Sequence, residues 1–451
     1  MKYVAVGDLK NNPDYAWLKI IGPDTAGMTG LEGARYDPIN SAGETVKENM
    51  IVVLRGSISD MELYLNRLER VSELTRQYNS EGYGIPQYMR IQYESGEYWY
   101  SKLISFELFN EKHSLSYLAK GSVGIRIEIE RENYWTGDAV GLPLSNGNGA
   151  NITTGLTIFN HDDGGAGHDN FVYINALDLN TDLPAPLKIE VLNNYATGSL
   201  KDLIIGSNQF NANESALQNL VMEMETGTGG TPTADPNCSN GQYNAITWTA
   251  TTWTTLWYKA LSATDLGKYR GRTVIPVLRL QAAHGITPLY LKLRMVKGST
   301  IIADYKESWS KPGYGFVIFP PVKLPPAETA YELYPYAYTI QILGLQAGAT
   351  ATINADYLQF IPTESIGQYL AVENLIQNDR IIDDAFSKVV YTRTAGNQEI
   401  VTHQAITKGH FLKPGMNGAY FYFFHSDNND LATIARTLSI KIYYRPRKRI
   451  V

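Results

Sequence analysis

The chain has 451 residues, of which 44% are hydrophobic, and a formal net charge of −6. The hydrophobic content excludes wholesale disorder, and at about 150 residues per domain the length predicts about three domains. Phosphate neutralisation needs a basic surface, so the negative charge argues against a general nucleic-acid binder, and we expect no sequence-specific nucleic acid as a partner. Aromatic residues reach 11%, with 31 tyrosines, which is typical of β structure and of protein–protein contacts.

Membrane insertion and export are not expected. The longest apolar runs, at residues 316–321 and 419–424, are far shorter than the ~20 residues that span a bilayer. Asp8 comes too early for the apolar part of a secretory signal. Cys238 is the only cysteine in the sequence, which excludes an intrachain disulfide and a thiolate metal site. We therefore expect assembly in a reducing cytoplasm.

An amphipathic helix is the first strong pattern along the chain, at residues 59–78. Ser59 and Glu62 fit a capping box at its start, and Ile58 and Leu63 are placed for a hydrophobic staple. The apolar positions that recur at helical spacing are Met61, Tyr64, Leu65, Leu68 and Val71. This stripe predicts that the helix packs on an apolar surface.

Strands predicted on both sides of the helix supply that surface. Residues 50–54 precede it, and residues 87–93 and 97–108 follow it, separated by a tight turn. Residues 123–129 alternate strictly between aliphatic and polar or small side chains, as in a strand with one buried face. The pattern predicts an N-terminal α+β domain over residues 1–137.

Beyond Trp135 the sequence predicts β-sandwich domains. Glycines separate short strands, and longer strands with turn signals recur to the end of the chain with almost no helical periodicity. Residues 226–241, rich in Gly, Thr, Pro and Asn, are expected to form a long loop. The predicted fold class is therefore mainly β.

Recognisable motifs for chemistry are absent from the sequence. There is no phosphate loop, dinucleotide fingerprint, nucleophile elbow or HExxH helix, and the seven histidines lack metal-ligand spacing. The densest polar cluster runs from His161 to Asp169 on a Gly-rich loop, which suits Ca²⁺ but equally a solvated turn. We favour the turn and leave calcium open. We expect no catalytic, cofactor-binding or metal residue, no cofactor and no enzymatic activity.

Two further clusters carry alternatives. Trp248, Trp253 and Trp257 lie among threonines, so they could stack on sugar rings, although burial in a sandwich core is the favoured interpretation. A basic cluster close to the C-terminus contains Arg445, Arg447, Lys448 and Arg449. It is interpreted as a solvated tail that keeps an edge strand from pairing, with contact to an acidic partner or DNA as the alternative.

Taken in order, several segments resemble minor tail proteins of long-tailed bacteriophages, in particular the distal-tail class. These segments are IVVLRG (51–56) with the following helix and strands, IERENYW (129–135), LPLSN (142–146), INADYLQFIP (353–362) and IYYRPR (442–447). The first resembles the tail-tube-like ring domain of that class, and the fourth resembles the last strand of a jelly-roll insert. In order, the segments are spread over most of the chain.

The resemblance implies an architecture with four parts. Residues 1–137 would form a tail-tube-like ring domain, and residues 138–184 and 366–451 would form one split β-sandwich. Residues 185–365 would be an inserted jelly roll similar to a carbohydrate-binding module.

The resemblance also implies a function. The protein would be a virion component that forms a ring, with sixfold symmetry implied, at the distal tail or baseplate after assembly in the host cytoplasm. Its partners would be copies of itself, other tail proteins and host-surface glycans. The rival hypothesis is a carbohydrate-binding or glycan-hydrolysing β-sandwich protein, whose carboxylates could come from distant strands.

Overall fold

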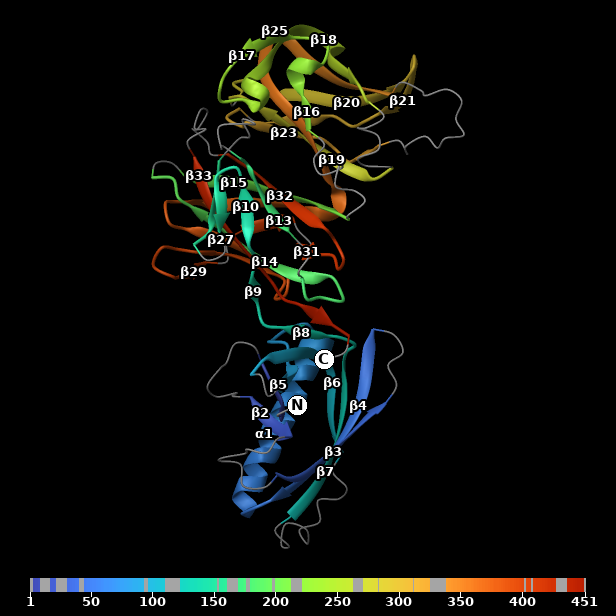
Figure 1. Cartoon of the computed structure of the whole chain (residues 1–451), viewed down its shortest axis with the longest axis vertical. Helices are drawn as coiled ribbons and strands as arrows, with labels where there is room; N and C mark the ends of the chain where they lie inside the picture. Colours follow the sequence, from blue (N-terminus) through green and yellow to red (C-terminus); the bar gives the residue numbers. More distant parts are fainter. Residues whose placement is uncertain are drawn as a thin grey trace. The chain divides into compact units, whose positions relative to one another are not determined.

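The computed structural model describes most of the chain and divides it into two compact units. The described residues are 3–8, 17–21, 31–39, 44–92, 96–109, 122–151, 154–159, 169–175, 179–196, 199–211, 221–262, 271–282, 284–310, 312–324, 338–400, 403–406, 409–426 and 436–449. The first unit contains Met1–Ala139, Asn180–Leu183 and Arg445–Val451, and the second contains Val140–Leu179 and Pro184–Tyr444. Strands dominate both units, so the predicted fold class, mainly β with β-sandwich domains, is confirmed (Figure 1).

The first unit is built on one antiparallel sheet. Its path runs β2-β1-β5-β6-β7-β4-β3, with β8 and β34 paired at the side of β6. The strands are β1 Tyr3–Gly7, β2 Leu18–Ile21, β3 Leu31–Ile39, β4 Thr45–Arg55, β5 Tyr88–Gln92, β6 Tyr98–Phe109, β7 Ser122–Glu132, β8 Trp135–Gly137 and β34 Arg447–Lys448. Strands β4 and β7 pair in continuous register from Thr45–Glu132 to Arg55–Ser122.

Helix α1, Ile58–Arg76, packs its apolar stripe on one face of this sheet, as the sequence predicts (Figure 1). Leu68 is fully buried and shares a cluster with Ile127 and Phe106 of the sheet, and Leu65 packs partly buried against it. A π-helical turn, Gln77–Glu81, continues α1 and ends at Gly82 in the left-handed conformation. The helix therefore covers one sheet face.

The predicted start of the helix is wrong by two residues. The N-cap is Ser57, whose hydroxyl accepts a hydrogen bond from the Asp60 backbone N–H, rather than Ser59. The expected staple is also absent, because Ile58 and Leu63 are 50% and 53% exposed. Gly56, with φ 150°, turns the chain out of β4 immediately before the earlier cap. Both Ser57 and Ser59 fit a capping pattern, and the turn at Gly56 allows Ser57 to serve as the N-cap.

The basic C-terminal segment is part of the first unit and does not form the predicted solvated tail. Arg447 and Lys448 form β34, which pairs with Thr136 and Trp135 of β8. The Arg447 guanidinium lies 4.6 Å from the Tyr134 ring centroid, and the Lys448 ammonium lies 5.3 Å from that of Trp99. Cation–π contacts of this kind hold the segment against the sheet instead of releasing it to solvent.

The second unit contains a β-sandwich of two facing sheets. One sheet has the order β11-β10-β13-β32-β15-β26-β30; the other has β12-β33-β14-β27-β28-β29, with β31 beside β14 and β9 beside β33. The strands are β9 Val140–Gly141, β10 Leu144–Asn146, β11 Gly149–Asn151, β12 Leu156–Phe159, β13 Phe171–Asn175, β14 Ala185–Asn193, β15 Leu200–Phe210, β26 Ile366–Leu375, β27 Arg380–Asp384, β28 Val389–Arg393, β29 Glu399–Ile400, β30 His403–Ile406, β31 Phe411–Leu412, β32 Gly418–Ser426 and β33 Thr437–Tyr444. Leu203 and Phe421 of one sheet share a buried cluster with Val191 and Ile440 of the other.

An insert between β15 and β26 forms a further ten-stranded arrangement around the long strands β18 and β25. Its elements are β16 Val221–Glu223, η4 Met224–Thr226, β17 Thr231–Ala234, η5 Ser239–Gly241, β18 Gln242–Ala260, β19 Thr273–Leu280, β20 Leu289–Lys297, β21 Thr300–Asp304, β22 Ser308–Ser310, β23 Phe316–Ile318, β24 Val322–Lys323, β25 Tyr338–Pro362 and η6 Thr363–Ser365. The segment 226–241, expected to be a loop, thus contains β17 paired with β18.

The insert begins later than the predicted boundary at residue 185. Strand β14 pairs with β33 and β27, and β15 pairs with β32 and β26, so both belong to the sandwich sheets. Pro184 and Pro186 predict a domain break in the sequence, but Pro184 directly precedes β14, and Ala185 and Pro186 are the first two residues of that strand. The strands of the insert span residues 221–362.

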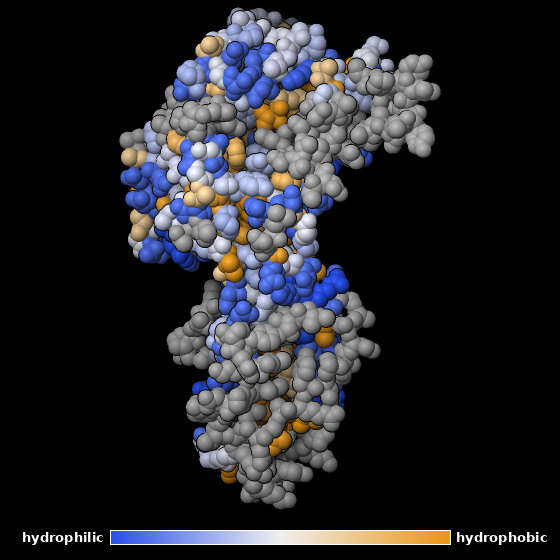
Figure 2. Space-filling view, in the orientation of Figure 1, coloured by the Kyte–Doolittle hydropathy of each residue, from blue (hydrophilic) through white to orange (hydrophobic). Residues whose placement is uncertain are grey.

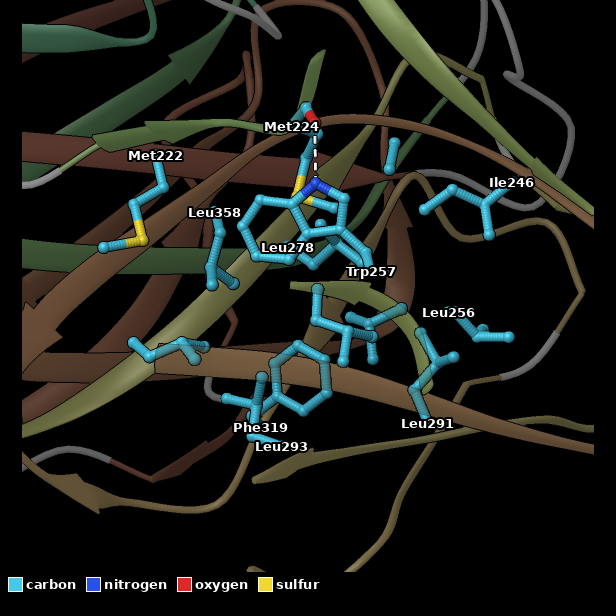
Figure 3. Close-up of a cluster of buried hydrophobic side chains, with 14 of the residues drawn as sticks. Met222, Met224, Ile246, Leu256, Trp257, Leu278, Leu291, Leu293, Phe319 and Leu358 are labelled. Carbon is cyan, nitrogen blue, oxygen red and sulfur yellow. Dashed lines mark hydrogen bonds between the residues drawn. The ribbon is translucent and has the colours of Figure 1, made fainter. Parts of the chain in front are cut away.

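The core of the insert surrounds Trp257. Its indole is fully buried, and Nε1 donates a hydrogen bond of 2.7 Å to the Met224 carbonyl of η4 (Figure 3). Leu278 and Leu358 belong to the same buried cluster (Figure 3). The bond satisfies the one polar atom of this large side chain, so burial retains its full apolar benefit.

A smaller apolar cluster joins the insert to the sandwich within the second unit. Ile204, Tyr422 and Phe424 of the sandwich meet Val277 and Ile361 of the insert. Beside them, the Asn170 side-chain amide donates a 2.7 Å hydrogen bond to the Tyr357 hydroxyl oxygen. The cavity described below is also lined by residues of both the insert and the sandwich.

Candidate functional sites

The three tryptophans singled out in the sequence separate into two groups. Trp248 and Trp257 are core residues, 6% and 0% exposed, as the favoured interpretation predicts. Trp253 is half-buried, and its ring lies 4.9 Å from the Lys292 ammonium group. The polar cluster His161–Asp169 lies outside the described residues except for Asp169, so the calcium question stays a prediction.

Trp253 belongs to a surface that we call the aromatic–basic face of the insert. It contains Tyr290, Lys292 and Arg294 of β20, Trp309 of β22, Asp304 of β21, and Trp253 and Tyr258 of β18. Directly opposed residues of antiparallel strands share a face, and Tyr290 opposes Trp309 while Arg294 opposes Asp304. Tyr258 reaches the same row because both it and Arg294 oppose Gln341 of β25.

The aromatic side chains of this face are unusually open to solvent. Trp309 is 61% exposed and Tyr258 is 44% exposed, whereas Leu289, Leu291 and Leu293, which alternate with the outward residues of β20, are at most 1% exposed. Figure 2 shows, in one view, that hydrophobic residues on the visible described surface form small separate groups among hydrophilic ones. Large exposed apolar rings on a sheet face indicate a contact surface.

Charged groups lie between the rings. Asp304 accepts hydrogen bonds from Lys292 at 3.0 Å and from Arg294 at 3.3 Å. Partial desolvation raises the pKa of the Asp304 carboxyl, but these two hydrogen bonds outweigh that effect and hold the pKa below its usual value. Two cations share one carboxylate, so the face keeps a positive excess. A protein recognises a hydroxylated, ring-shaped ligand by stacking an aromatic ring on it and by placing hydrogen-bonding groups beside that ring.

A cavity of about 280 Å³ lies where the insert meets the sandwich. Its lining residues are Pro184, Ser207, Gln209, Arg272, Pro362, Glu364, Ser365, His410, Phe411 and Lys413. The Gln209 side chain organises one wall, because its amide nitrogen donates to the Phe411 carbonyl and its amide oxygen accepts from the Lys413 backbone N–H. Also among the lining residues, the Ser365 hydroxyl donates to the Ser207 carbonyl.

Behind the cavity, three polar side chains are buried in the sandwich core. The Tyr369 hydroxyl of β26 donates to Asp383 Oδ2 of β27, and His410 Nε2 lies 3.2 Å from the Tyr369 oxygen and 3.7 Å from Asp383 Oδ2. Burial raises the pKa of Asp383 to about 6, although the Tyr369 hydrogen bond opposes this shift, and burial lowers the pKa of His410 to about 4. His410 is therefore neutral at neutral pH. The sequence offered no signal for this group, since its members come from three separate strands and loops.

Other candidate sites are structurally simple in the described parts of the chain. No group of three or more His, Cys, Asp or Glu side chains there is placed to hold a metal ion. The described helices include none with the length and apolar character needed to cross a membrane. Cys238 is buried, and burial raises the pKa of its thiol, which disfavours the reactive thiolate.

Comparisons with known proteins place the chain in no family. No protein-family model matches it, and no curated protein matches it. Among solved structures it is similar to an exo-beta-1,3-galactanase from Phanerochaete chrysosporium, at 11% identity, 80% coverage of this chain, 90% coverage of that chain and a TM-score of 0.18. It is also similar to a chain of infectious bursal disease virus, Gt strain, at 10% identity, coverages of 83% and 87%, and a TM-score of 0.14. Likenesses this weak carry no argument about function.

Proposed function

We propose that the protein is a structural virion component of a phage tail, where it forms a ring at the distal end and supports neighbouring tail or host-recognition proteins. The observation that carries this proposal is the sheet of the first unit. Its described path ends in β2 and β3, each with one paired strand beside it, and the Lys19 carbonyl of β2 also accepts a hydrogen bond of 2.8 Å from the Tyr64 hydroxyl of α1. An edge strand left open is an aggregation hazard, and pairing with another copy removes it.

The two faces of this sheet support growth through its edges. One face is covered by α1, and the other carries Arg126, Glu128 and Glu130, which alternate with buried isoleucines of β7. A covered face and a charged face are poor places for extensive apolar contact between copies. Pairing β3 of one copy with β2 of the next is a head-to-tail contact, which closes into a ring when the rotation allows. Sixfold closure is the symmetry that the sequence resemblance implies.

This proposal assigns no catalytic residue. Its test has two parts: mass spectrometry of purified phage particles should detect the protein, and light scattering of the pure full chain should give a closed oligomer. A chain that stays monomeric at tens of micromolar and is absent from particles would contradict the proposal. Release of reducing sugar from host cell-wall material, abolished by replacing one Asp or Glu, would establish the hydrolase alternative instead.

Carbohydrate binding is a second candidate function, favoured by the aromatic–basic face. Trp309 offers a flat ring to a sugar. Lys292 and Arg294 lie two and four residues along β20 from Tyr290, which opposes Trp309, and with Asp304, which opposes Arg294, they offer donors and acceptors. Host-surface glycans are the proposed ligands. In a glycan-binding assay, Trp309→Ala should reduce binding about tenfold or more, consistent with the loss of one stacking contact. Tyr83→Ala, at an equally exposed ring in the first unit, should leave binding unchanged.

A further inference from the structure

The cavity between the insert and the sandwich combines features of a built ligand site. Arg272 and Lys413 bring two positive charges to its lining and Glu364 brings one negative charge. The nearest ion pair is long, with 4.0 Å between Lys413 Nζ and Glu364 Oε1, and both side chains are more than half exposed. Such a pair contributes little by itself, so Lys413 can contact another anion at small cost.

His410 gives the cavity a second, independent feature. The residue is 3% exposed and lines the cavity, and its Nε2 edge is turned to Tyr369 and Asp383. Its other ring nitrogen, Nδ1, is buried without a hydrogen-bond partner within the described structure. A buried polar atom without a partner costs free energy, which a ligand group can recover.

The hydrogen bonds behind His410 decide what Nδ1 needs. Tyr369 gives its only hydroxyl proton to Asp383, so its oxygen accepts a proton from His410 Nε2. The neutral ring then carries its single proton on Nε2 and leaves a lone pair on Nδ1. The matching ligand group is a hydroxyl that donates to Nδ1.

We propose that this cavity binds a small polyol that carries a phosphate or carboxylate group, such as a sugar phosphate or a sugar acid. The anionic group lies near Arg272 and Lys413, and a ligand hydroxyl donates to His410 Nδ1. The Ser365 hydroxyl of the lining gives its proton to the Ser207 carbonyl and keeps lone pairs that can accept from a polyol hydroxyl. This inference is independent of the ring, because it concerns the second unit alone.

Calorimetric titration of the full chain tests the proposal with four probes: glucose 6-phosphate, glucuronate, glucose and inorganic phosphate. Glucose 6-phosphate, glucuronate or both should bind at least about tenfold more tightly than glucose and than phosphate, because only they satisfy both ends of the site. The two anionic probes separate phosphate from carboxylate as the preferred group. Absence of saturable binding by either would overturn the proposal.

Matched charge reversals locate the binding. Lys413→Glu should weaken the preferred probe by about tenfold, whereas Lys306→Glu, at an exposed lysine of the insert remote from the lining residues, should change it less than about twofold. With histidine-labelled protein, the Nδ1 resonance of one neutral imidazole should shift on saturation and remain unshifted with inorganic phosphate. Equal binding of phosphate and of the sugar phosphate, insensitive to Lys413→Glu, would mean an adventitious ion only and would refute the assignment.

Discussion

At the scale of single residues, Leu68 is the clearest test of how α1 is held. Its side chain is 0% exposed among sheet residues, so Leu68→Ala should leave a cavity and destabilise the first unit by about 2–5 kcal/mol. Hydrogen exchange of the α1 amides in the full chain measures this locally. Leu63→Ala on the same helix is the control: at 53% exposure it should change protection by less than about 0.5 kcal/mol. Equal effects of the two would contradict the described packing.

The pair Asp383 and His410 predicts a compensated response to pH. The raised pKa of Asp383, about 6, means that the folded protein holds this proton where the unfolded chain has lost it, so its contribution to stability falls between pH ~4 and ~6. The lowered pKa of His410, about 4, has the opposite consequence: its contribution is full above pH ~6.5 and is lost as the pH falls towards 4. The two slopes oppose each other over the same range.

Replacing one member should therefore reveal the other. Relative to the unsubstituted chain, Asp383→Asn should make the rise in stability from pH ~4 to ~6.5 larger by about 3 kcal/mol, because the opposing Asp383 contribution is lost. His284 and His425, whose pKa values burial also lowers, contribute equally with and without the substitution. His410→Gln should instead make that rise smaller by a similar amount, because the His410 contribution is lost. Urea unfolding of the full chain at a series of pH values measures both slopes. If both substitutions changed the slope in the same direction relative to the unsubstituted chain, these groups would not titrate as described.

Some residue-scale features could be predicted from the sequence, and others could not. The apolar stripe of α1 is a local pattern, and its burial was predictable from helical spacing. The choice of Ser57 over Ser59 as cap depends on how the chain leaves β4 at Gly56, which is a matter of tertiary geometry. The contacts of His410 with Tyr369 and Asp383 depend on two facing sheets, so no local pattern indicates them.

At the scale of elements, the turn after β16 packs closely against Trp257 of β18. A Cβ added at Gly227 would lie 2.2 Å from Trp257 Nε1, the atom that bonds the Met224 carbonyl. Gly227→Ala should therefore displace the indole and cost about 2–4 kcal/mol, from overpacking and the lost hydrogen bond. Gly241→Ala is the matched control, because the space around its Cβ is open and only its positive φ adds strain, about 1 kcal/mol. Hydrogen exchange of the β18 amides distinguishes the two variants, and equal losses of protection would contradict the close packing at Gly227.

Strand composition was more predictable than strand pairing. Alternation identified the β7 segment, because this pattern needs only one buried face. The division at residue 185 was misplaced because Pro184 and Pro186 look like a break, whereas β14 lies between β33 and β27 in the sandwich. The aromatic–basic face was missed in the same way: Trp309 and Asp304 reach β20 only through a register that tertiary packing fixes.

At the scale of the whole molecule, three separate segments of sequence form the first unit. Residues Asn180–Leu183 and Arg445–Val451 belong with Met1–Ala139, and the backbone N–H of Asp182 donates to the Arg447 carbonyl at 2.7 Å. Such returns of the chain depend on contacts between residues hundreds of positions apart. A solvated basic tail was therefore a reasonable interpretation of the sequence, although in the fold this segment forms a strand that pairs with β8.

The ring proposal makes a prediction about one edge strand. Strand β3 pairs with β4 alone in the described sheet, in continuous register from Gly33 to Ile39. In an edge strand, the backbone N–H groups of alternate residues point towards the neighbouring strand and away from it. Pro38 has no N–H to donate, so it fits a position at which the N–H would point away from β4. Ala34 lies four residues earlier in the same alternating set. Ala34→Pro should therefore block pairing with another copy while it preserves the ladder to β4.

We expect Ala34→Pro to convert the oligomer of the full chain to a folded monomer, measured by light scattering together with circular dichroism. Ala234→Pro supplies a matched control: β17 is likewise an end strand of its sheet, and Ala234 shares the alternating set of Pro232. That variant should leave assembly unchanged, because the ring is proposed to form through the first unit. Loss of assembly in Ala234→Pro but not in Ala34→Pro would move the contact to the insert. An intact oligomer in both variants would exclude edge pairing through β3 as the contact that builds the ring.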